Sequence, residues 1–278
     1  MKKYRLAIAL SAVLSAIFVY FAAFTGGQNW VVAVCDVGQG DAVMIRSNSS
    51  IAMVDMGASE KLLDKCMKRF SVQRINLLVI SHYDRDHVGG YKSVVGKVDR
   101  VLTGENDRRL ASVIESTLVK GGASMSRVHK GDTGLLGQMK WEIIWPRRDN
   151  PPNLRRGNNG SVVIAFRGDK LSMIFLGDLG KPAQQLIFSD FTNTTHGVYD
   201  IVKVAHHGSS DQFPMLYKHI SAKYGIISAG KRNRYGHPTK IALEILRKYG
   251  TQPLITSVSG YISISGNRDN FEIHKEHD

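Results

Sequence analysis

Apolar residues fill the N-terminal part of the chain almost without interruption. Leu6–Phe24 has Ser11, Ser15 and Tyr20 as its polar interruptions, and basic residues precede it. At a rise of about 1.5 Å per residue, a helix of this length is just long enough to cross a bilayer. We therefore expect one N-terminal transmembrane helix within residues 1–28, with its first residues in the cytoplasm. A cleaved signal peptide, which usually has a shorter apolar core, is the alternative.

The rest of the chain, residues 29–278, alternates between strand-like and helix-like patterns. Alternating or wholly apolar runs predict strands at Trp30–Cys35, Ala42–Arg46, Ile51–Val54, Asn76–Ile80, Val98–Leu102, Lys140–Trp145, Ser161–Arg167, Leu171–Leu176, Ile201–Ala205, Tyr224–Ser228, Leu254–Ser257 and Tyr261–Ser265. Helical spacing predicts helices at Glu60–Phe70, Arg108–Val119, Pro182–Phe188 and Pro238–Tyr249. Because strands and helices alternate in both halves without a linker, we expect one α/β domain of two mixed sheets packed face to face, with helices outside.

The chain is strongly basic, with a formal net charge of +13. Lys2, Lys3 and Arg5 account for three of these charges, which leaves +10 for the predicted domain. A basic domain favours anionic partners such as nucleic acid, a phosphorylated polymer or anionic lipid, although many soluble proteins are also basic.

Cys35 and Cys66 are the two cysteines of the chain. In an exported protein they could form a disulfide, because such compartments are oxidising. Cys35 lies in a predicted strand and Cys66 in a predicted helix, so both could equally be small buried apolar residues. Since the sequence does not give their separation, we favour two unpaired cysteines and leave pairing open.

The densest chemical signal is the segment from Ser81 to Gly90, which follows a wholly apolar strand. Its potential ligands are His82, Asp84, Asp86 and His87. Imidazoles and carboxylates are the groups that divalent cations bind. At this spacing, the side chains of residues 82 and 84 can point together toward one ion, while residues 86 and 87 face a second. A solvated polar loop would not explain why two histidines and two aspartates crowd the end of a buried strand.

Two later motifs also follow apolar strands. Gly177-Asp178-Leu179-Gly180 places Asp178 where it could bridge two cations, and Val204-Ala205-His206-His207-Gly208-Ser209 offers His206 or His207 to complete the second ion's site. Alone, each motif would more often be an ordinary turn or a surface feature. Three strand ends that each deliver ligand-type side chains indicate a two-metal site.

These motifs, with Asp36-Val37-Gly38-Gln39-Gly40-Asp41 before them, resemble the metallo-β-lactamase superfamily. The resemblance is strongest to the C-terminal domain of ComEC-type competence proteins. It is carried by residues 158–161, 177–179, 206–209 and 233–238, and it spans about residues 30–265. It implies a four-layer αββα sandwich with a binuclear site at one edge, and nuclease or other phosphodiesterase activity.

The resemblance also implies roles for particular residues. His82 and Asp84 would hold one ion, while Asp86, His87 and His206 would hold the other. Asp178 would lie between the two ions. We choose His206 over His207 because it is nearer the strand end. Full-length competence proteins carry many membrane helices, and the single segment expected here does not allow a transport role to be carried over.

Two departures from the wider superfamily bear on the metal. Asp84 replaces the usual second histidine, and Asn158 and Asn159 stand where a third ligand-loop histidine is usual, as in the competence branch. An oxygen ligand in place of nitrogen makes the first site harder and more anionic. This shifts the preference from Zn²⁺ toward Mn²⁺ or Mg²⁺.

The expected reaction is attack of a metal-activated hydroxide on a phosphodiester. Asp86, Asp178 and His237 are the candidate catalytic residues, and Asn158, Ser161, His207 and Arg234 are the candidate substrate-binding residues. The stretch from Lys231 to His237 could instead be a solvated basic turn. Asn158 could be a plain turn residue. The expected substrate is DNA, RNA or a nucleotide. The alternatives are another hydrolase of this scaffold, such as a β-lactamase or a cell-wall phosphoesterase, and a non-catalytic DNA-binding protein at the cell surface.

Overall fold

The computed structural model describes residues 29–105, 109–169, 171–192 and 197–277. The predicted membrane segment Leu6–Phe24 lies outside these residues. Among the residues that are described, no helix is both long enough and apolar enough to cross a bilayer.

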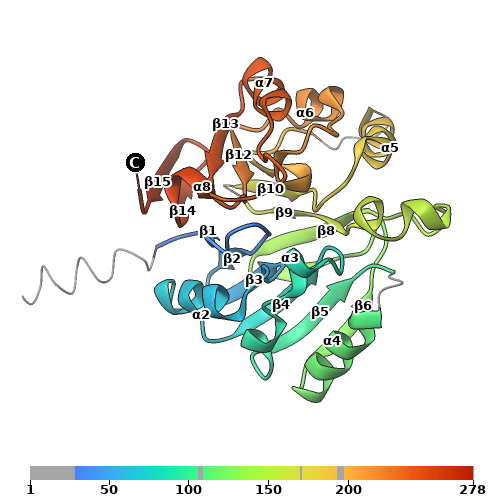
Figure 1. Ribbon diagram of the computed structural model, residues 1–278, viewed down its shortest axis with the longest axis vertical. Helices are drawn as coiled ribbons and strands as arrows, with labels where there is room; N and C mark the ends of the chain where they lie inside the picture. Colours follow the sequence, from blue (N-terminus) through green and yellow to red (C-terminus); the bar gives the residue numbers. More distant parts are fainter. Residues whose placement is uncertain (1–28, 106–108, 170, 193–196, 278) are drawn as a thin grey trace, which may run out of the picture.

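The described strands form two sheets, which lie face to face (Figure 1). The first sheet is 8-stranded, in the spatial order β15 (Asn270–Lys275), β14 (Ile262–Asn267), β1 (Val32–Val34), β2 (Val43–Ser47), β3 (Ser50–Val54), β4 (Ile75–Ile80), β5 (Val98–Thr103) and β6 (Ser124–Arg127). Pairing is antiparallel from β15 to β3 and parallel from β3 to β6. The mixed character of this sheet agrees with the sequence prediction.

The second sheet has 7 strands in the described part of the chain. Their order is β13 (Gln252–Ile255), β12 (Tyr224–Ile227), β11 (Ile201–Lys203), β10 (Ser172–Phe175), β9 (Val163–Arg167), β8 (Met139–Trp145) and β7 (Thr133–Leu136). Strands β10 to β13 are parallel, and β10, β9, β8 and β7 are antiparallel. The two strands predicted on either side of Gly168 are therefore confirmed, as the antiparallel pair β9–β10.

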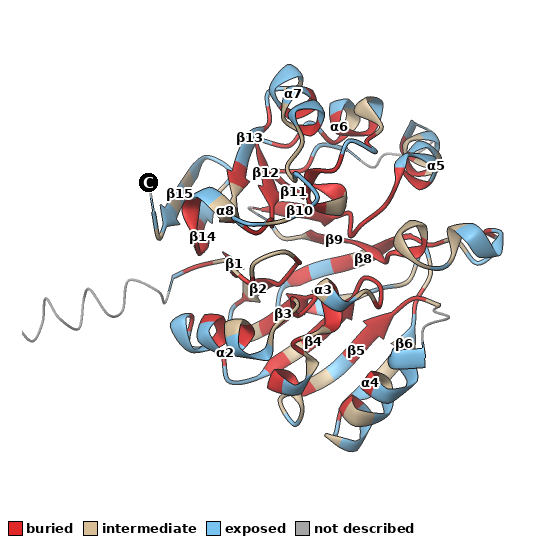
Figure 2. Ribbon diagram, viewed as in Figure 1, coloured by how far each residue is buried: buried red, intermediate tan, exposed pale blue. Residues whose placement is uncertain are grey.

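Helices cover the outer face of each sheet. The larger helices are α2 (Glu60–Arg69) and α4 (Arg109–Lys120) on the first sheet, and α5 (Lys181–Thr192), α6 (Pro214–Ile220) and α7 (Lys240–Lys248) on the second. One apolar cluster lies between the two sheets, and one lies between each sheet and its helices. Buried residues therefore line both faces of the central strands, as Figure 2 shows. This is the four-layer αββα sandwich that was predicted.

Strand β4 shows why the wholly apolar run was a good signal. Leu78 and Ile80 pack toward α2 and α4, whereas Leu77 and Val79 pack toward the second sheet. Side chains alternate across a strand, so a strand that is covered on both faces needs apolar residues at every position. The same burial makes β4 a rigid support for the polar segment that follows it.

The strands and helices that were not predicted from the sequence are short or lie at sheet edges. Strands β6 and β15 contain no fully buried residue, and their apolar patterns are short: Met125 in β6, and Phe271 and Ile273 in β15. Strand β7 and helix α6, the latter 7 residues long, were also missed. The predicted helix from Pro238 begins later than expected, because Thr239 caps it through a hydrogen bond from the Ala242 backbone N–H to Oγ1.

Cys35 and Cys66 form a disulfide, so the expectation of two unpaired cysteines is wrong. Helix α2 crosses the outer face of the first sheet and brings the two Cα atoms to 5.6 Å, a separation that the sequence could not supply. The bond ties the end of β1 to α2, and both residues are fully buried.

Candidate metal centre

The predicted site residues meet at one edge of the sandwich. Strands β3 and β4 of the first sheet and β10, β11 and β12 of the second each run parallel to at least one neighbouring strand, and polar residues follow the carboxyl end of each. Carboxyl ends of parallel strands are the usual place for a site in α/β folds. The two halves of the chain therefore each supply part of the candidate centre.

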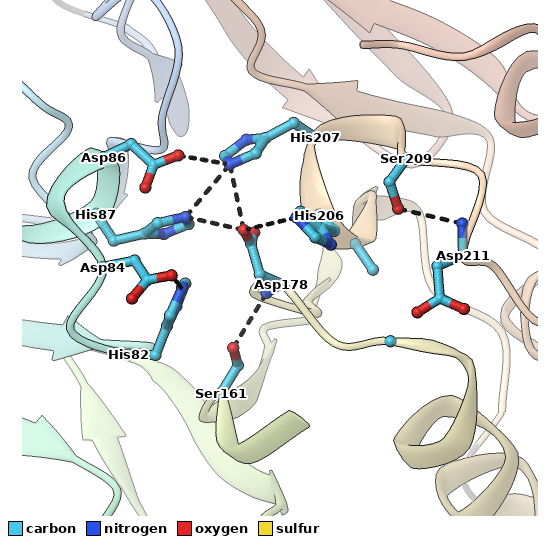
Figure 3. A network of polar contacts seen from close by, with 12 residues as sticks. His82, Asp84, Asp86, His87, Ser161, Asp178, His206, His207, Ser209 and Asp211 are labelled. Atoms are coloured by element: carbon cyan, nitrogen blue, oxygen red, sulfur yellow. Dashed lines mark hydrogen bonds and ion pairs between the residues drawn. The ribbon is translucent and has the colours of Figure 1, made fainter. Parts of the chain in front are cut away.

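The 82–87 segment turns from β4 into the short helix α3 (Arg85–Val88). This turn points Asp86 and His87 toward the second sheet, where they face Asp178 and His207 (Figure 3). The loop between β1 and β2 packs tightly against α3 at Gly40. A Cβ atom added to Gly40 would lie 2.0 Å from the Asp86 carbonyl oxygen. Glycine at position 40 is thus needed for this close approach.

Possible ligand atoms of three side chains lie around the Nε2 atom of His207. The Nε2 atom of His207 lies 3.3 Å from Asp86 Oδ2, 3.3 Å from His87 Nε2 and 3.3 Å from Asp178 Oδ2. His87 Nε2 lies 3.2 Å from the same Asp178 oxygen. The donor spacing of a tetrahedral Zn²⁺ site with bonds of about 2.0–2.1 Å is about 3.3–3.4 Å, so these side chains fit a metal ion.

Buried atoms without hydrogen-bond partners support the same fit. Asp178 Oδ1 and His82 Nε2 are both buried, and neither atom has a hydrogen-bond partner within the described residues. Buried polar atoms are normally satisfied, and metal coordination is one way to satisfy them. The Nε2 atoms of His87 and His207 lie 3.3 Å apart and both face Asp178 Oδ2, so in their neutral form both could bind one cation.

The carboxylates in this pocket raise the pKa values of the histidines beside them. Burial alone would lower the pKa of His87 and of His207, but Asp178 acts on both rings and holds each pKa well above its usual value. Asp55 adds to the effect on His87, and Asp41 to that on His207. Burial would raise the pKa of Asp178, and the two histidines outweigh it and hold that pKa well below its usual value. A pocket with this balance of charges suits a cation.

Among the described residues, four buried side chains have possible ligand atoms that all lie within 4.8 Å of one another: Asp41, His87, Asp178 and His207. Asp41 Oδ1 lies 3.2 Å from Nδ1 of His207, on the side of the ring away from the Nε2 contacts, and its Oδ2 accepts from Lys203 Nζ at 2.6 Å. Asp41 Oδ1 is buried and has no hydrogen-bond partner in the part of the chain that the structure describes. Asp41 therefore lies behind the His207 ring, where Lys203 neutralises its carboxylate.

Asp55 holds His87 in a similar way. Its Oδ2 contacts His87 Nδ1 at 2.8 Å, and its carboxylate also accepts from the Ser81 backbone N–H and hydroxyl at 2.8 and 2.6 Å. A carboxylate on the far nitrogen fixes the tautomer and orientation of a metal-binding histidine. His207 Nδ1 is held by the Ser228 carbonyl at 2.9 Å. Both Nε2 atoms are thus aimed at Asp178 Oδ2.

The structure brings His207, rather than the expected His206, into the group with Asp86 and His87. His206 Nε2 is 3.8 Å from Asp178 Oδ2, and its side chain is 31% exposed against 1% for His207. Both histidines adopt left-handed backbone conformations, with φ of 48° and 52°. This rare conformation for residues other than glycine turns the two rings toward different sides of Asp178.

His82 and Asp84 lie together beside this group, as Figure 3 shows. His82 Nε2 is 3.7 Å from Asp84 Oδ2, and the His82 ring packs against the His87 ring at 4.2 Å between centroids. This pair is where the first ion was expected, and the exposed part of Asp84 opens it to solvent.

The residues expected to contact substrate are placed differently from one another. Ser161 is fully buried, and its Oγ accepts from the Asp178 backbone N–H at 3.1 Å, so it supports Asp178. Its contact with substrate stays a prediction. Asn158 is half-buried in a short helix, η3 (Asn158–Gly160), beside Ser161. His237 lies edge-on to the His206 ring at 5.6 Å, and Arg234 is exposed.

Asp41, Asp55 and Lys203 were not predicted to belong to the site. Asp41 ends the motif of residues 36–41, which carries part of the family resemblance but indicates no role for this residue. Asp55 follows a strand in the same way as Asp178 does. Lys203 is a charge within an apolar strand, which would have been a signal, because a buried lysine almost always has a partner.

Replacing Asp55 by asparagine is expected to lower metal affinity about 10- to 100-fold. Asparagine tolerates the left-handed conformation of this position, where φ is 59°. Its amide cannot accept from Ser81 twice and also hold His87, so the His87 ring loses its fixed orientation. Competition with a chelator for Mn²⁺ or Zn²⁺ would measure the change. An unaltered affinity in a folded Asp55→Asn protein would show that the Asp55–His87 contact does not serve the metal.

No protein-family model matches the chain. Solved structures nevertheless share its fold. CmlA, a diiron β-hydroxylase from Streptomyces venezuelae, superimposes with a TM-score of 0.59 at 14% identity, over 89% of this chain and 55% of CmlA. The metallo-β-lactamase fold protein YhfI from Bacillus subtilis superimposes with a TM-score of 0.55 at 10% identity, over 87% of this chain and 99% of YhfI. The chain therefore has the metallo-β-lactamase fold that its motifs predicted.

Curated relatives narrow the class further. ComE operon protein 3 of Bacillus subtilis is 25% identical over 90% of this chain and 34% of its own length. Competence protein ComA of Neisseria gonorrhoeae is 25% identical over 82% and 31%, and Recombination protein 2 of Haemophilus influenzae 26% over 88% and 30%. Within the metallo-β-lactamase fold, the chain is thus similar to competence proteins of the ComEC type, as expected. It spans about a third of the length of these relatives.

Proposed function

We propose that this protein is a metal-dependent hydrolase that cleaves phosphodiester bonds in nucleic acid. The observation that carries the proposal is that Asp86, His87 and Asp178 each lie 3.3 Å from His207 Nε2, with His87 and Asp178 3.2 Å apart. Two divalent cations, when bound, would lower the pKa of a water molecule and neutralise charge on the phosphodiester. Asp178 lies between the His207 and His206 sides and is the candidate bridge between the two ions.

The oxygen-rich ligand set supports Mn²⁺ or Mg²⁺ as well as Zn²⁺. Asp84 and Asp86 supply oxygens next to His82 and His87, and harder cations prefer oxygen ligands. Asp55 would keep His87 aimed at the ions and the Ser228 carbonyl would do so for His207, while Ser161 positions the backbone of Asp178.

Charge supports nucleic acid as the substrate. The chain carries +13 overall, and relatives that it resembles are named for competence and for recombination. The disulfide supports an extracytoplasmic location, because such bonds persist in oxidising compartments. We therefore propose a domain outside the cytoplasm, attached to the membrane through the predicted N-terminal helix.

The direct test incubates the full chain with single- and double-stranded DNA and with RNA, across Mn²⁺, Mg²⁺ and Zn²⁺. We expect cleavage that depends on added metal and stops in EDTA. Nitrocefin turnover without nucleic acid cleavage would instead indicate a β-lactamase. DNA retention in EDTA without cleavage in any metal would indicate a binding protein and would refute the hydrolase.

A further inference from the structure

Three aromatic rings form a stack that leads from the buried centre to the surface. The His207 ring stacks on His237, with centroids 6.3 Å apart and planes 28° apart, and His237 stacks on Tyr235 at 5.7 Å and 24°. His207 is 1% exposed, whereas Tyr235 is 70% exposed. The outer end of the stack is thus a large apolar ring surface in solvent, two ring steps from a candidate metal ligand.

The turn that carries Tyr235 is held in place from within. The Asn233 side-chain amide donates to the carbonyl oxygens of Gly230 and His237 at 2.8 and 2.7 Å, and its Oδ1 accepts from the His237 backbone N–H at 2.9 Å. Asn233 therefore closes the turn between Gly230 and His237. A ring fixed in this way loses little conformational entropy when a ligand stacks on it.

Cations surround the exposed ring. Lys231, Arg232 and Arg234 are all exposed, and among the residues that the structure describes none of the three pairs with a carboxylate. Positive side chains interleaved with an exposed aromatic ring are the combination that binds single-stranded nucleic acid, because the cations hold phosphates while the ring stacks on a base.

We propose that Tyr235 is a stacking platform for an unpaired nucleobase, with Arg232 and Arg234 binding the flanking phosphates. This inference rests on the proposed function and names its substrate class as single-stranded DNA or RNA. Bases within a duplex already have both faces stacked, so only an unpaired or terminal base can lie on the exposed ring. A strand bound here would pass beside the half-buried His237 ring, which stacks on His207 at the candidate centre.

The test measures binding rather than cleavage. Fluorescence anisotropy of the full chain in EDTA compares a labelled 12-nucleotide DNA strand, the same RNA sequence, the DNA duplex, and a strand of equal length made of abasic units. We expect wild type to bind the base-bearing strands about ten-fold more tightly than the abasic strand, and Tyr235→Ala to lose that preference. Tyr235→Phe should keep it, since the ring remains.

Control variants separate stacking from charge and from general surface changes. Arg234→Gln should weaken binding of the base-bearing and abasic strands by the same factor, because it removes a phosphate contact. Leu135→Ala removes another exposed apolar side chain, on β7, and should change neither. Since Tyr235 is exposed, its variants should melt as wild type does.

The inference is overturned if wild type binds the abasic strand as tightly as the base-bearing strands, or if Tyr235→Ala retains the preference. A loss of the same size on the duplex would overturn the single-strand assignment. Failure of the proposed function is a different result. Base-dependent binding through Tyr235 without cleavage in any metal would retain the platform and remove the hydrolase.

Discussion

Asp178→Asn is expected to abolish metal-dependent phosphodiester cleavage, a loss of at least about 10³-fold. The side chain keeps its size, and its backbone N–H still donates to Ser161 Oγ, so the fold should be preserved. What is lost is the negative charge and one lone-pair-bearing oxygen at the point where the His87 and His207 Nε2 atoms converge. Metal content per chain should fall together with the cleavage rate.

Asp200→Asn is the matched control for this change. Asp200 is also a buried carboxylate of the second sheet. It directly precedes β11, at the end of that strand away from the candidate centre, where it accepts from Arg268 and from the Ser172 backbone N–H. The Asp200→Asn protein should be less stable and still bind metal. Full activity and full metal content in a folded Asp178→Asn protein would refute the placement of the metal centre.

Loss of the Cys35–Cys66 disulfide is expected to destabilise the domain by about 3–4 kcal/mol, the chain-entropy value for a loop with a sequence separation of 31. For a domain of this size the melting temperature should fall by roughly 10 °C. The Cys35→Ala, Cys66→Ala double variant, compared with wild type by thermal and urea unfolding, measures the effect directly.

Reductant gives the control for the double variant. Both cysteines are fully buried, so thiol titration must first show that dithiothreitol has opened the bond in wild type. Reduced wild type should then melt close to the double variant, while the double variant itself should not respond to reductant. Equal melting of oxidised and reduced wild type would show that the bond does not stabilise the domain.

Much of the site could be predicted because its residues follow apolar strands. The motifs that contain His87 and Asp178 each follow a buried apolar strand. Strand β4 is parallel to β3 and β10 is parallel to β11, so the carboxyl ends of these strands lie at one edge of the sandwich. Local patterning therefore located the strand ends, and the motif resemblance correctly gave the order of layers.

The remaining site features depend on contacts between distant segments. The choice between His206 and His207 depends on two left-handed residues, which no periodicity indicates. The Lys203–Asp41 pair joins residues from different sheets, so neither residue shows its role within its own segment. The disulfide was misjudged for the same reason, since its formation depends on how α2 crosses the first sheet.

The last hairpin of the described chain has a consequence for biosynthesis. Strands β14 and β15 are made last, yet β14 pairs with β1, the first strand, and so completes a sheet whose other members were made early. Until the ribosome has released this hairpin, β1 has an unpaired edge next to the segment that carries Asp41. The edge of β1 next to Asp41 therefore stays open until residues 262–267 have been synthesised, because its partner strand comes from more than 200 residues further along the chain.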